Sequence, residues 1–342
     1  MAPQAAVGVD TEFMRERTYY AQLCLLQLGT PGLSVCVDPL AIQSLDPLRP
    51  LMSASATCKI LHAARQDLEV LAPVVGNVAP VFDTQVAAAL VGFPAQVGYA
   101  ELVSRIIGVE LHKSQTRTDW SRRPLSAAQL DYALDDVRHL PPLREALGER
   151  LERLGRKDWF DEEMALLAGE SYSVDPDLAW LRIKAFTDLD PDRQRLARQL
   201  AAWRERRAIS SNRPRGWILP DAALRDIVLQ VPRDRRDLAG LRELPEGIRA
   251  NSGPQLLELI SAAAVPDPAA PLPPRRRPDP QQLELVARLA DATRRIGAAL
   301  ELAPEILATR RELERLANGH RDGPLLRGWR REVVGAELLK AL

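Results

Sequence analysis

Asp10 and Glu12 stand two residues apart in a short, β-rich stretch, residues 7–13. Alternate side chains of a strand share one face, so the two carboxylates would project side by side, with Gly8 before them on that face. Adjacent carboxylates repel each other, and burying them is costly unless a cation neutralises them. Hard oxygen ligands suit Mg²⁺ or Mn²⁺. The alternative is an edge strand with a solvated acidic face.

Tyr132 and Asp136 form a second candidate pair, spaced one helical turn apart. Ser126 and Gln129 have the spacing of a capping box, which predicts a helix that starts there and runs through both residues. Positions i and i+4 share a helix face, where a phenol and a carboxylate can bind one metal and hold its water. Asp135 lies about 100° further round the helix, and we expect it on the solvated surface.

Asp67 is the next candidate carboxylate, because it follows a strand-like stretch, residues 59–61, at the expected junction with a helix. N-capping is the alternative role for Asp67, and it is the role that we expect for Asp83 before Thr84. We expect His62 to lie near the metal ligands without being one, since hard metals prefer oxygen.

Strands and helices alternate in the first half of the chain, where these side chains lie. Strand-like stretches are residues 7–13, 22–28, 33–38 and 59–61, and helix-like stretches are residues 67–71, 84–90 and 100–107. The second half contains no convincing strand. Its helix-like stretches are residues 193–207, a segment opened by Pro220 with Asp221 as N-cap, and residues 283–300. The sequence thus predicts an α/β domain followed by helices.

The 342 residues carry no net charge, with 46 basic and 46 acidic side chains, but the two halves differ. Residues 1–174 have 16 basic and 22 acidic residues, a net of −6, and residues 175–342 have 30 and 24, a net of +6. Such asymmetry favours a nucleic-acid-binding part. Residues 193–215 concentrate arginine, and the alternative is a solvated helix face. The candidate RNA-binding residues are Arg198, Arg206, Arg207, Arg213 and Arg215.

Three cysteines without CxxC spacing, Cys24, Cys36 and Cys58, argue against a disulfide framework and a structural zinc site. The longest apolar runs are too short to span a membrane, and the N-terminus lacks the pattern of a signal peptide. We therefore expect a cytoplasmic protein.

Taken together, the carboxylates resemble the DEDD superfamily of 3′→5′ exonucleases, in the branch that has a tyrosine in its third motif. Asp10 and Glu12 match the first motif, Asp67 the second, and Tyr132 with Asp136 the third. The phrases at residues 9–13, 62–69, 82–85 and 119–121 are similar to the ribonuclease D family, and the similarity covers nearly the whole chain. That family has a strand and a helix before the first motif, but only nine residues precede Asp10, so we expect one edge strand to be missing.

The resemblance implies an α/β ribonuclease H-like exonuclease domain, residues 1–172, followed by two small all-α helical domains. The first, residues 173–262, would be a nucleic-acid-binding (HRDC-like) domain of the kind shared with certain helicases. Residues 263–280 are Pro-rich and predict a stiff linker. Residues 281–342 would be a second, divergent HRDC-like domain, and the stretch from Pro304 loosely echoes the stretch from Pro220.

The resemblance also implies a mechanism with two divalent cations, Mg²⁺ or Mn²⁺. Asp10 would bridge them, Glu12 and Asp136 would hold the cation that activates water, and Asp67 would hold the second. Tyr132 would orient the water. The expected substrate contacts are Thr11, Phe13, Met14, His62, Lys113, Gln115, Trp120 and Arg122, with Phe13 and Trp120 as core aromatics in the alternative interpretation.

The function implied is that of a monomeric 3′→5′ exoribonuclease that releases nucleoside 5′-monophosphates. Its expected partners are transfer-RNA precursors and other small structured RNAs, without a membrane. Two alternatives stay open at this point: a 3′→5′ DNA exonuclease, which shares the catalytic residues, and a catalytically inactive RNA-binding protein.

Overall fold

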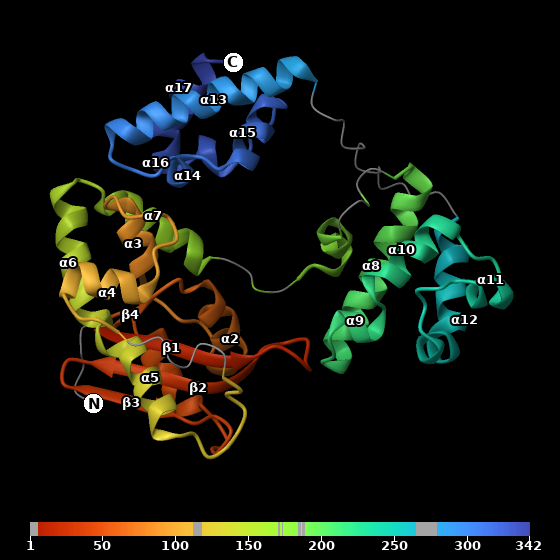
Figure 1. Cartoon of the computed structure of the whole chain (residues 1–342), viewed down its shortest axis with the longest axis horizontal. Coiled ribbons are helices and arrows are strands. Elements are labelled where there is room, and N and C mark those ends of the chain that lie inside the picture. The colour runs from red at the N-terminus through yellow and green to blue at the C-terminus, as the bar shows by residue number, and fades with distance from the viewer. Residues whose placement is uncertain are drawn as a thin grey trace. The chain divides into compact units, whose positions relative to one another are not determined.

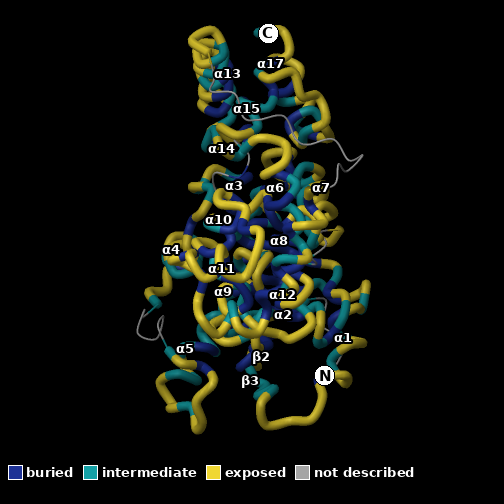
Figure 2. Tube along the Cα trace, turned by 90° about the vertical axis from the view of Figure 1, so that its right-hand side faces the viewer, coloured by how far each residue is buried: buried dark blue, intermediate teal, exposed yellow. Residues whose placement is uncertain are grey.

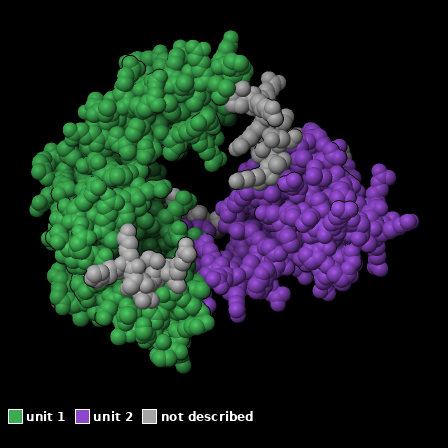
Figure 3. Space-filling model, in the orientation of Figure 1, with its two compact units in different colours: residues 1–14, 23–170, 278–342 green, residues 15–22, 171–277 purple. Residues whose placement is uncertain are grey.

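The computed structural model describes residues 6–111, 118–169, 172, 174–183, 186, 189–264 and 279–342. It groups the chain into two compact units (Figure 3). Unit 1 comprises Met1–Met14, Leu23–Glu170 and Pro278–Leu342, and unit 2 comprises Arg15–Gln22 and Ser171–Arg277. Within the described residues, every helix is too short or too polar to cross a membrane.

A mixed sheet of five strands forms the centre of unit 1, in the order β3-β2-β1-β4-β5. Its strands are β1 (Ala6–Met14), β2 (Gln22–Thr30), β3 (Leu33–Val37), β4 (Cys58–Leu61) and β5 (Val81–Asp83). β2 and β3 pair antiparallel, whereas β4 pairs parallel with both β1 and β5. The strands predicted from the sequence are present, and the short β5 was not predicted.

The helices of unit 1 that precede residue 170 surround this sheet (Figure 1). They are α1 (Arg49–Ser53), α2 (Arg65–Val75), α3 (Thr84–Leu90), α4 (Tyr99–Ile107), α5 (Ala127–Arg138), α6 (Leu140–Arg153) and α7 (Lys157–Ala168), with the 3₁₀ turn Asp46–Leu48 before α1. α5 packs against β1 and β3, and α6 packs against β1 and β4. The predicted capping box of Ser126 and Gln129 opens α5, and Asp83 caps α3 by accepting from the Gln85 amide at 2.8 Å. Both predictions are confirmed.

Two glycines allow α5 to approach the sheet closely. A Cβ atom on Gly8 of β1 would lie 2.9 Å from the carbonyl oxygen of Val137, and one on Gly29 of β2 would lie 2.6 Å from the same oxygen. Only residues without a side chain fit at these positions.

The C-terminal helices pack against α7 within unit 1. They are α13 (Pro280–Ala299), α14 (Pro304–Leu307), α15 (Arg310–Ala317), α16 (Gly328–Arg330) and α17 (Ala336–Lys340). The indole rings of Trp159 and Trp329 stack with centroids 4.7 Å apart, and Trp329 Nε1 donates to Glu163 at 2.7 Å. The guanidinium of Arg156 donates to the carbonyls of Leu90 at 2.7 Å and Leu300 at 2.5 Å.

Unit 2 is helical, with a buried apolar face on the long helix α8 (Figure 2). Its elements are the 3₁₀ helix η2 (Pro176–Arg182), α8 (Pro191–Ser211), α9 (Arg215–Ile218), α10 (Asp221–Gln230), α11 (Arg235–Ala239) and α12 (Glu246–Ala263). The described parts of residues 189–264 and 279–342 contain no strand, as predicted. Most of the predicted linker, residues 265–278, lies outside the described residues; Ala263 belongs to α12 and Pro280 to α13.

One capping prediction in unit 2 is wrong. Asp221 is the first residue of α10, Pro220 is at the N-cap, and no side chain caps this helix. The Asp221 carboxylate instead accepts from the guanidinium of Arg204, whose side chain is only 4% exposed. A buried guanidinium needs a counter-charge, and this need determines where the carboxylate lies.

The loop between β1 and β2 is part of unit 2. Glu205 of α8 is fully buried and accepts hydrogen bonds from the Tyr19 hydroxyl and from two nitrogens of Arg215, at 2.6 and 2.8 Å. The side-chain oxygen of Asn212 accepts from the backbone amides of Tyr19 and Tyr20, at 3.1 and 3.2 Å.

Candidate active site

Three carboxylates from two elements converge in unit 1. Asp10 and Glu12 project from β1, and Asp136 projects from α5. Each offers an oxygen that lies within 4.8 Å of an oxygen of the other two. Among the described residues, no other group of three or more acidic, histidine or cysteine side chains is spaced closely enough to bind one metal ion. The strand alternation and the helix turn used in the sequence analysis therefore bring these residues together.

Burial, and then the proximity of these carboxylates to one another, opposes their ionisation. Burial raises the pKa of Glu12 to about 8, and the charges of Asp136 and Asp67 add to this effect. Burial, followed by repulsion from Asp135, raises the pKa of Asp136 to about 7. The pKa of Asp10 is also raised, by burial and then by the surrounding carboxylates. A divalent cation would remove the repulsion, so this oxygen-only set fits a hard metal ion.

Asp67 lies beside this group without belonging to it. It is in the first turn of α2, where Ala64 is the N-cap, so the alternative capping role is excluded. Its carboxylate accepts a hydrogen bond from the Thr11 hydroxyl at 2.5 Å. Burial raises the pKa of Asp67 to about 6, although the Thr11 hydrogen bond opposes the shift. Asp67 is close enough for its charge to raise the pKa of Asp10 and Glu12.

Tyr132 faces the carboxylates from α5. Its hydroxyl donates to Asp136, and burial together with the negative charges of Asp136 and Glu12 raises the pKa of the phenol. The ring of Trp120 lies beside it, with centroids 6.2 Å apart. Tyr132 therefore keeps its proton, and its hydroxyl is a donor or acceptor of hydrogen bonds rather than a base.

His62 has both ring nitrogens engaged within the protein. Nε2 lies 3.0 Å from the Val97 carbonyl, to which it donates, and Nδ1 lies 2.9 Å from the Thr84 hydroxyl. Neither nitrogen is left for a metal, in agreement with the expectation that His62 is not a ligand.

Tyr99 is a neighbour of the site that the sequence analysis missed. Its ring lies 5.6 Å from that of His62, and its hydroxyl donates to the Asp135 carbonyl at 3.0 Å. Burial, followed by the charge of Asp136, raises its pKa. Nothing in the sequence around Tyr99 predicts that the start of α4 lies beside α5.

The other predicted substrate contacts lie in different environments. Trp120 is 4% exposed and packs with Cys24, Leu25 and Ala133, with Met14 against the same cluster, which favours a structural role. Phe13 is partly buried, and Arg122 is exposed and paired with Asp119 at 3.1 Å. Lys113 and Gln115 lie outside the described residues. The substrate contacts of these residues stay predictions.

Comparison with known proteins gives the carboxylate site its context. Residues 2–152 match the model of a family described as 3′-5′ exonuclease, and residues 193–260 match the HRDC domain. Ribonuclease D of Granulibacter bethesdensis is 41% identical over 346 residues, which cover 97% of this chain and 86% of the relative. The chain belongs to the ribonuclease D family.

Other members of the ribonuclease D family agree in length and fold. Ribonuclease D of Jannaschia sp. is 41% identical, and the alignment covers 100% of this chain and 91% of the relative. The crystal structure of Escherichia coli RNase D superimposes with a TM-score of 0.90 at 31% identity, covering 99% of this chain and 93% of that one. The chain is therefore a metal-dependent 3′→5′ exoribonuclease, with an α/β exonuclease domain followed by helical domains.

Within this ribonuclease D family member, the five predicted RNA-binding arginines differ in their partners. Arg206 pairs with Asp177 at 2.6 Å, and Arg207 donates to Gln255 at 3.2 Å. Arg215 is held by Glu205. The side chains of Arg198 and Arg213 make no ion pair or hydrogen bond with any described residue. The side chains with the least internal pairing are thus Arg198 and Arg213, whereas Arg215 has a structural partner.

Proposed function

We propose that this enzyme trims the 3′ ends of transfer-RNA precursors and other small structured RNAs with the help of two divalent cations, Mg²⁺ or Mn²⁺. The observation that carries the proposal is the convergence of Asp10, Glu12 and Asp136 within 4.8 Å, with Asp67 beside them. The Escherichia coli relative is described as an exoribonuclease involved in structured RNA processing, which supports the substrate class.

The four carboxylates, Tyr132 and Thr11 would have different roles in this mechanism. Asp10, on which the charges of all three other carboxylates act, would help to hold both cations, Glu12 and Asp136 would hold one of them, and Asp67 would hold the other. Cations bound there supply charge stabilisation for the phosphate oxygens and lower the pKa of water. The Tyr132 hydroxyl, which already contacts Asp136, would fix the orientation of the attacking water. Thr11 would hold Asp67 in position.

The helical unit 2 would bind segments of the RNA other than the bond that is cleaved. Arg198, Arg206, Arg207 and Arg213 are accessible or partly accessible on one helical unit and would bind phosphates, and Arg215 would contribute less because of its pairing with Glu205. One chain supplies all the carboxylates, so we propose a monomer that acts on RNA in the cytoplasm.

We also propose that residues 281–342 are a second, divergent HRDC-like domain, after residues 1–172, 173–262 and the linker 263–280. The order of helices supports this: a long helix, a four-residue helix and a medium helix follow one another in α8–α10 and again in α13–α15. In this order of helices, α14, which starts at Pro304, corresponds to α9, which starts at Arg215. The sequence similarity instead paired Pro304 with Pro220, so the two alignments of the helical parts differ by a few residues.

Incubation of the purified protein with a 3′-extended transfer RNA and its DNA counterpart, under Mg²⁺, Mn²⁺ or chelator, tests the proposal. We expect release of nucleoside 5′-monophosphates from the RNA only when a divalent cation is present. Asp10→Ala and Asp136→Ala should each lower the rate about 1,000-fold or more, since several kcal/mol of charge stabilisation is lost. Asp131→Ala removes an exposed carboxylate from the same helix and is the matched control.

Each alternative has its own outcome in this assay. Cleavage that persists in chelator would overturn the metal mechanism. Preferential cleavage of the DNA would support the DNA exonuclease, and retention of RNA without any turnover would support the inactive RNA-binding protein.

A further inference from the structure

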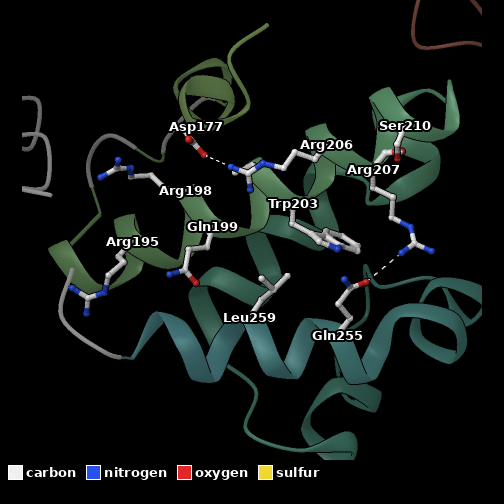
Figure 4. A pocket seen from close by; sticks show the side chains of 11 residues that line it. Asp177, Arg195, Arg198, Gln199, Trp203, Arg206, Arg207, Ser210, Gln255 and Leu259 are labelled. Carbon is white, nitrogen blue, oxygen red and sulfur yellow. Dashed lines mark hydrogen bonds and ion pairs between the residues drawn. The ribbon is translucent and has the colours of Figure 1, made fainter. Parts of the chain in front are cut away.

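A groove lies in unit 2 between α8, α12 and η2 (Figure 4). Its volume of about 780 Å³ is far larger than the space that one water molecule fills. Its volume falls within the usual range for small-molecule sites. Trp203 and Gln199 enter it from α8, and Leu259 and Gln255 enter it from α12. Four arginines border it against a single acid, Asp177. An apolar floor, two amides and a cationic rim thus occur together.

Arg207 forms a flat surface on one side of the groove. Its guanidinium carbon lies 5.8 Å from the centroid of the Trp203 ring, and it donates to Gln255 Oε1 at 3.2 Å (Figure 4). The indole and the amide together restrict the orientation of the guanidinium. Planar guanidinium groups and aromatic rings are surfaces on which nucleobases stack, whatever the base.

Gln199 supplies an unused acceptor. Its Oε1 atom is buried and has no hydrogen-bond partner among the described residues. A buried polar atom without a partner is costly, so a ligand that donates a hydrogen bond here would gain affinity. The exocyclic amino groups and ring N–H groups of unpaired bases are such donors, whereas in a duplex they are engaged by the opposite strand.

The rim arginines are available for an anion. Arg206 pairs with Asp177 at 2.6 Å, but both side chains are more than half exposed, so the pair is weak and a phosphate can replace the carboxylate. Arg198 lines the groove without an ion pair to any described residue. Arg195 is less available, because it donates to the Ala263 carbonyl and to Asp192, both at 2.6 Å.

We propose that this groove binds one unpaired nucleotide of the RNA, with the base between Arg207 and Gln199 and the phosphate at Arg198 and Arg206. The proposal rests on the proposed function for its choice of RNA as ligand, but it needs no cleavage. The same chemistry is offered by free nucleoside 5′-monophosphates, the products of the reaction. An unpaired segment of a substrate would therefore be held by the helical unit, and duplex RNA would not enter.

Binding by the full chain in metal-free buffer with chelator tests this, because cleavage is then absent and the unneutralised carboxylates repel phosphate. The probes are a labelled 12-nucleotide single-stranded RNA and a duplex of the same sequence, measured by fluorescence anisotropy. Gln199→Leu should weaken binding of the single strand about fivefold, the loss of one hydrogen bond. Arg207→Lys keeps the charge but removes the planar group, and should weaken it about threefold. The matched control is Arg225→Ala, an exposed arginine of α10 outside the groove, which should stay within about twofold of the parent.

Competition experiments distinguish RNA from free nucleoside monophosphate as the ligand of the groove. RNA displacement by adenosine 5′-monophosphate but not by ribose 5-phosphate would show that the base is recognised, and stronger competition by the oligonucleotide than by the mononucleotide would identify RNA as the ligand. Equal loss in Arg225→Ala, unchanged binding in both groove variants, or equal affinity for duplex RNA would overturn the proposal. A chain that cleaves RNA with unchanged binding in the groove variants refutes only this inference. A chain that binds through the groove but never cleaves refutes only the proposed function.

Discussion

Gly29 in β2 faces the backbone carbonyl of Val137 in α5 so closely that a methyl group on Gly29 would lie 2.6 Å from the carbonyl oxygen. Gly8 in β1 faces the same oxygen, with 2.9 Å for its methyl group. α5 therefore crosses two strands at points where neither has a side chain. Because Asp136 directly precedes Val137, this approach sets the distance between its carboxylate and those of Asp10 and Glu12.

Gly29→Ala should consequently impair catalysis without touching a carboxylate. A backbone oxygen cannot move aside, so α5 must shift, and overpacking of this kind costs about 1–3 kcal/mol of stability. We expect the exonuclease rate to fall roughly 10- to 100-fold, because small displacements of catalytic groups are expensive. Gly148→Ala in α6, where a new methyl group meets nothing within 4 Å, is the control. Parental activity in Gly29→Ala would contradict the role of this contact.

Thr11→Val should weaken the site through Asp67. The variant keeps the shape of the side chain but loses the donor to the Asp67 carboxylate. Loss of a hydrogen bond that orients a metal ligand lowers activity by roughly tenfold or more. The Mg²⁺ concentration for half-maximal activity should rise, whereas Thr11→Ser, which keeps the hydroxyl, should behave like the parent. Equal loss in both variants would point to packing instead.

Tyr132→Phe should separate water orientation from metal binding. The phenylalanine ring still packs beside Trp120, but the hydroxyl that contacts Asp136 is gone. We expect the maximal rate to fall about 10- to 100-fold with the thermal midpoint little changed. Titration calorimetry with Mn²⁺ should give nearly the parental affinity. A large loss of Mn²⁺ affinity would mean that the hydroxyl holds the site together instead.

The metal-free enzyme should lose stability as the pH rises. Glu12, Asp136 and Asp67 have folded-state pKa values of about 8, 7 and 6, above their ordinary values of 4.5, 3.8 and 3.8. The folded state then binds more protons than the unfolded state, so this stability is present at low pH and is lost as the pH rises through the folded values. In chelator, the melting temperature of unit 1 should decrease as the pH is raised from 6 to 8. The decrease should be about 2–4 °C for each kcal/mol of unfolding free energy that is lost.

Excess Mg²⁺ should largely remove this fall, since it replaces the protons, and Glu12→Gln should flatten the metal-free curve. A midpoint that rises with pH in chelator would show that the carboxylates are not repelling one another. Differential scanning fluorimetry across this pH range, with and without Mg²⁺, measures both effects.

Local patterns predicted much of this site. The alternation in β1 placed Asp10 with Glu12, and the capping box of Ser126 fixed the helix that carries Asp136, because both depend on neighbouring residues alone. The contact between Thr11 and Asp67 could not be predicted, since it joins residues 56 positions apart that meet only after the sheet has formed. Tyr99 was missed for the same reason.

Charged residues were harder to interpret, because their roles depend on buried partners. Asp221 has the position of a helix cap, but the buried Arg204 takes its carboxylate. Arg215 belongs to a run of arginines that predicts RNA binding, yet buried Glu205 holds it. The sequence does not predict either ion pair, because it does not distinguish an arginine that will be buried from one that will be exposed to solvent.

The buried Glu205 has a consequence for how freely the parts of this enzyme can be exchanged. Tyr19, its partner, lies a few residues beyond the strand that carries Asp10 and Glu12, so the helical unit incorporates a piece of chain from near the start of the exonuclease sequence. A chain cut at residue 169 would keep that piece and lose the carboxylate and the Asn212 oxygen that hold it. Recombination that transferred the helical unit to another nuclease would have to carry the Arg15–Gln22 loop along, and a single crossover cannot do this.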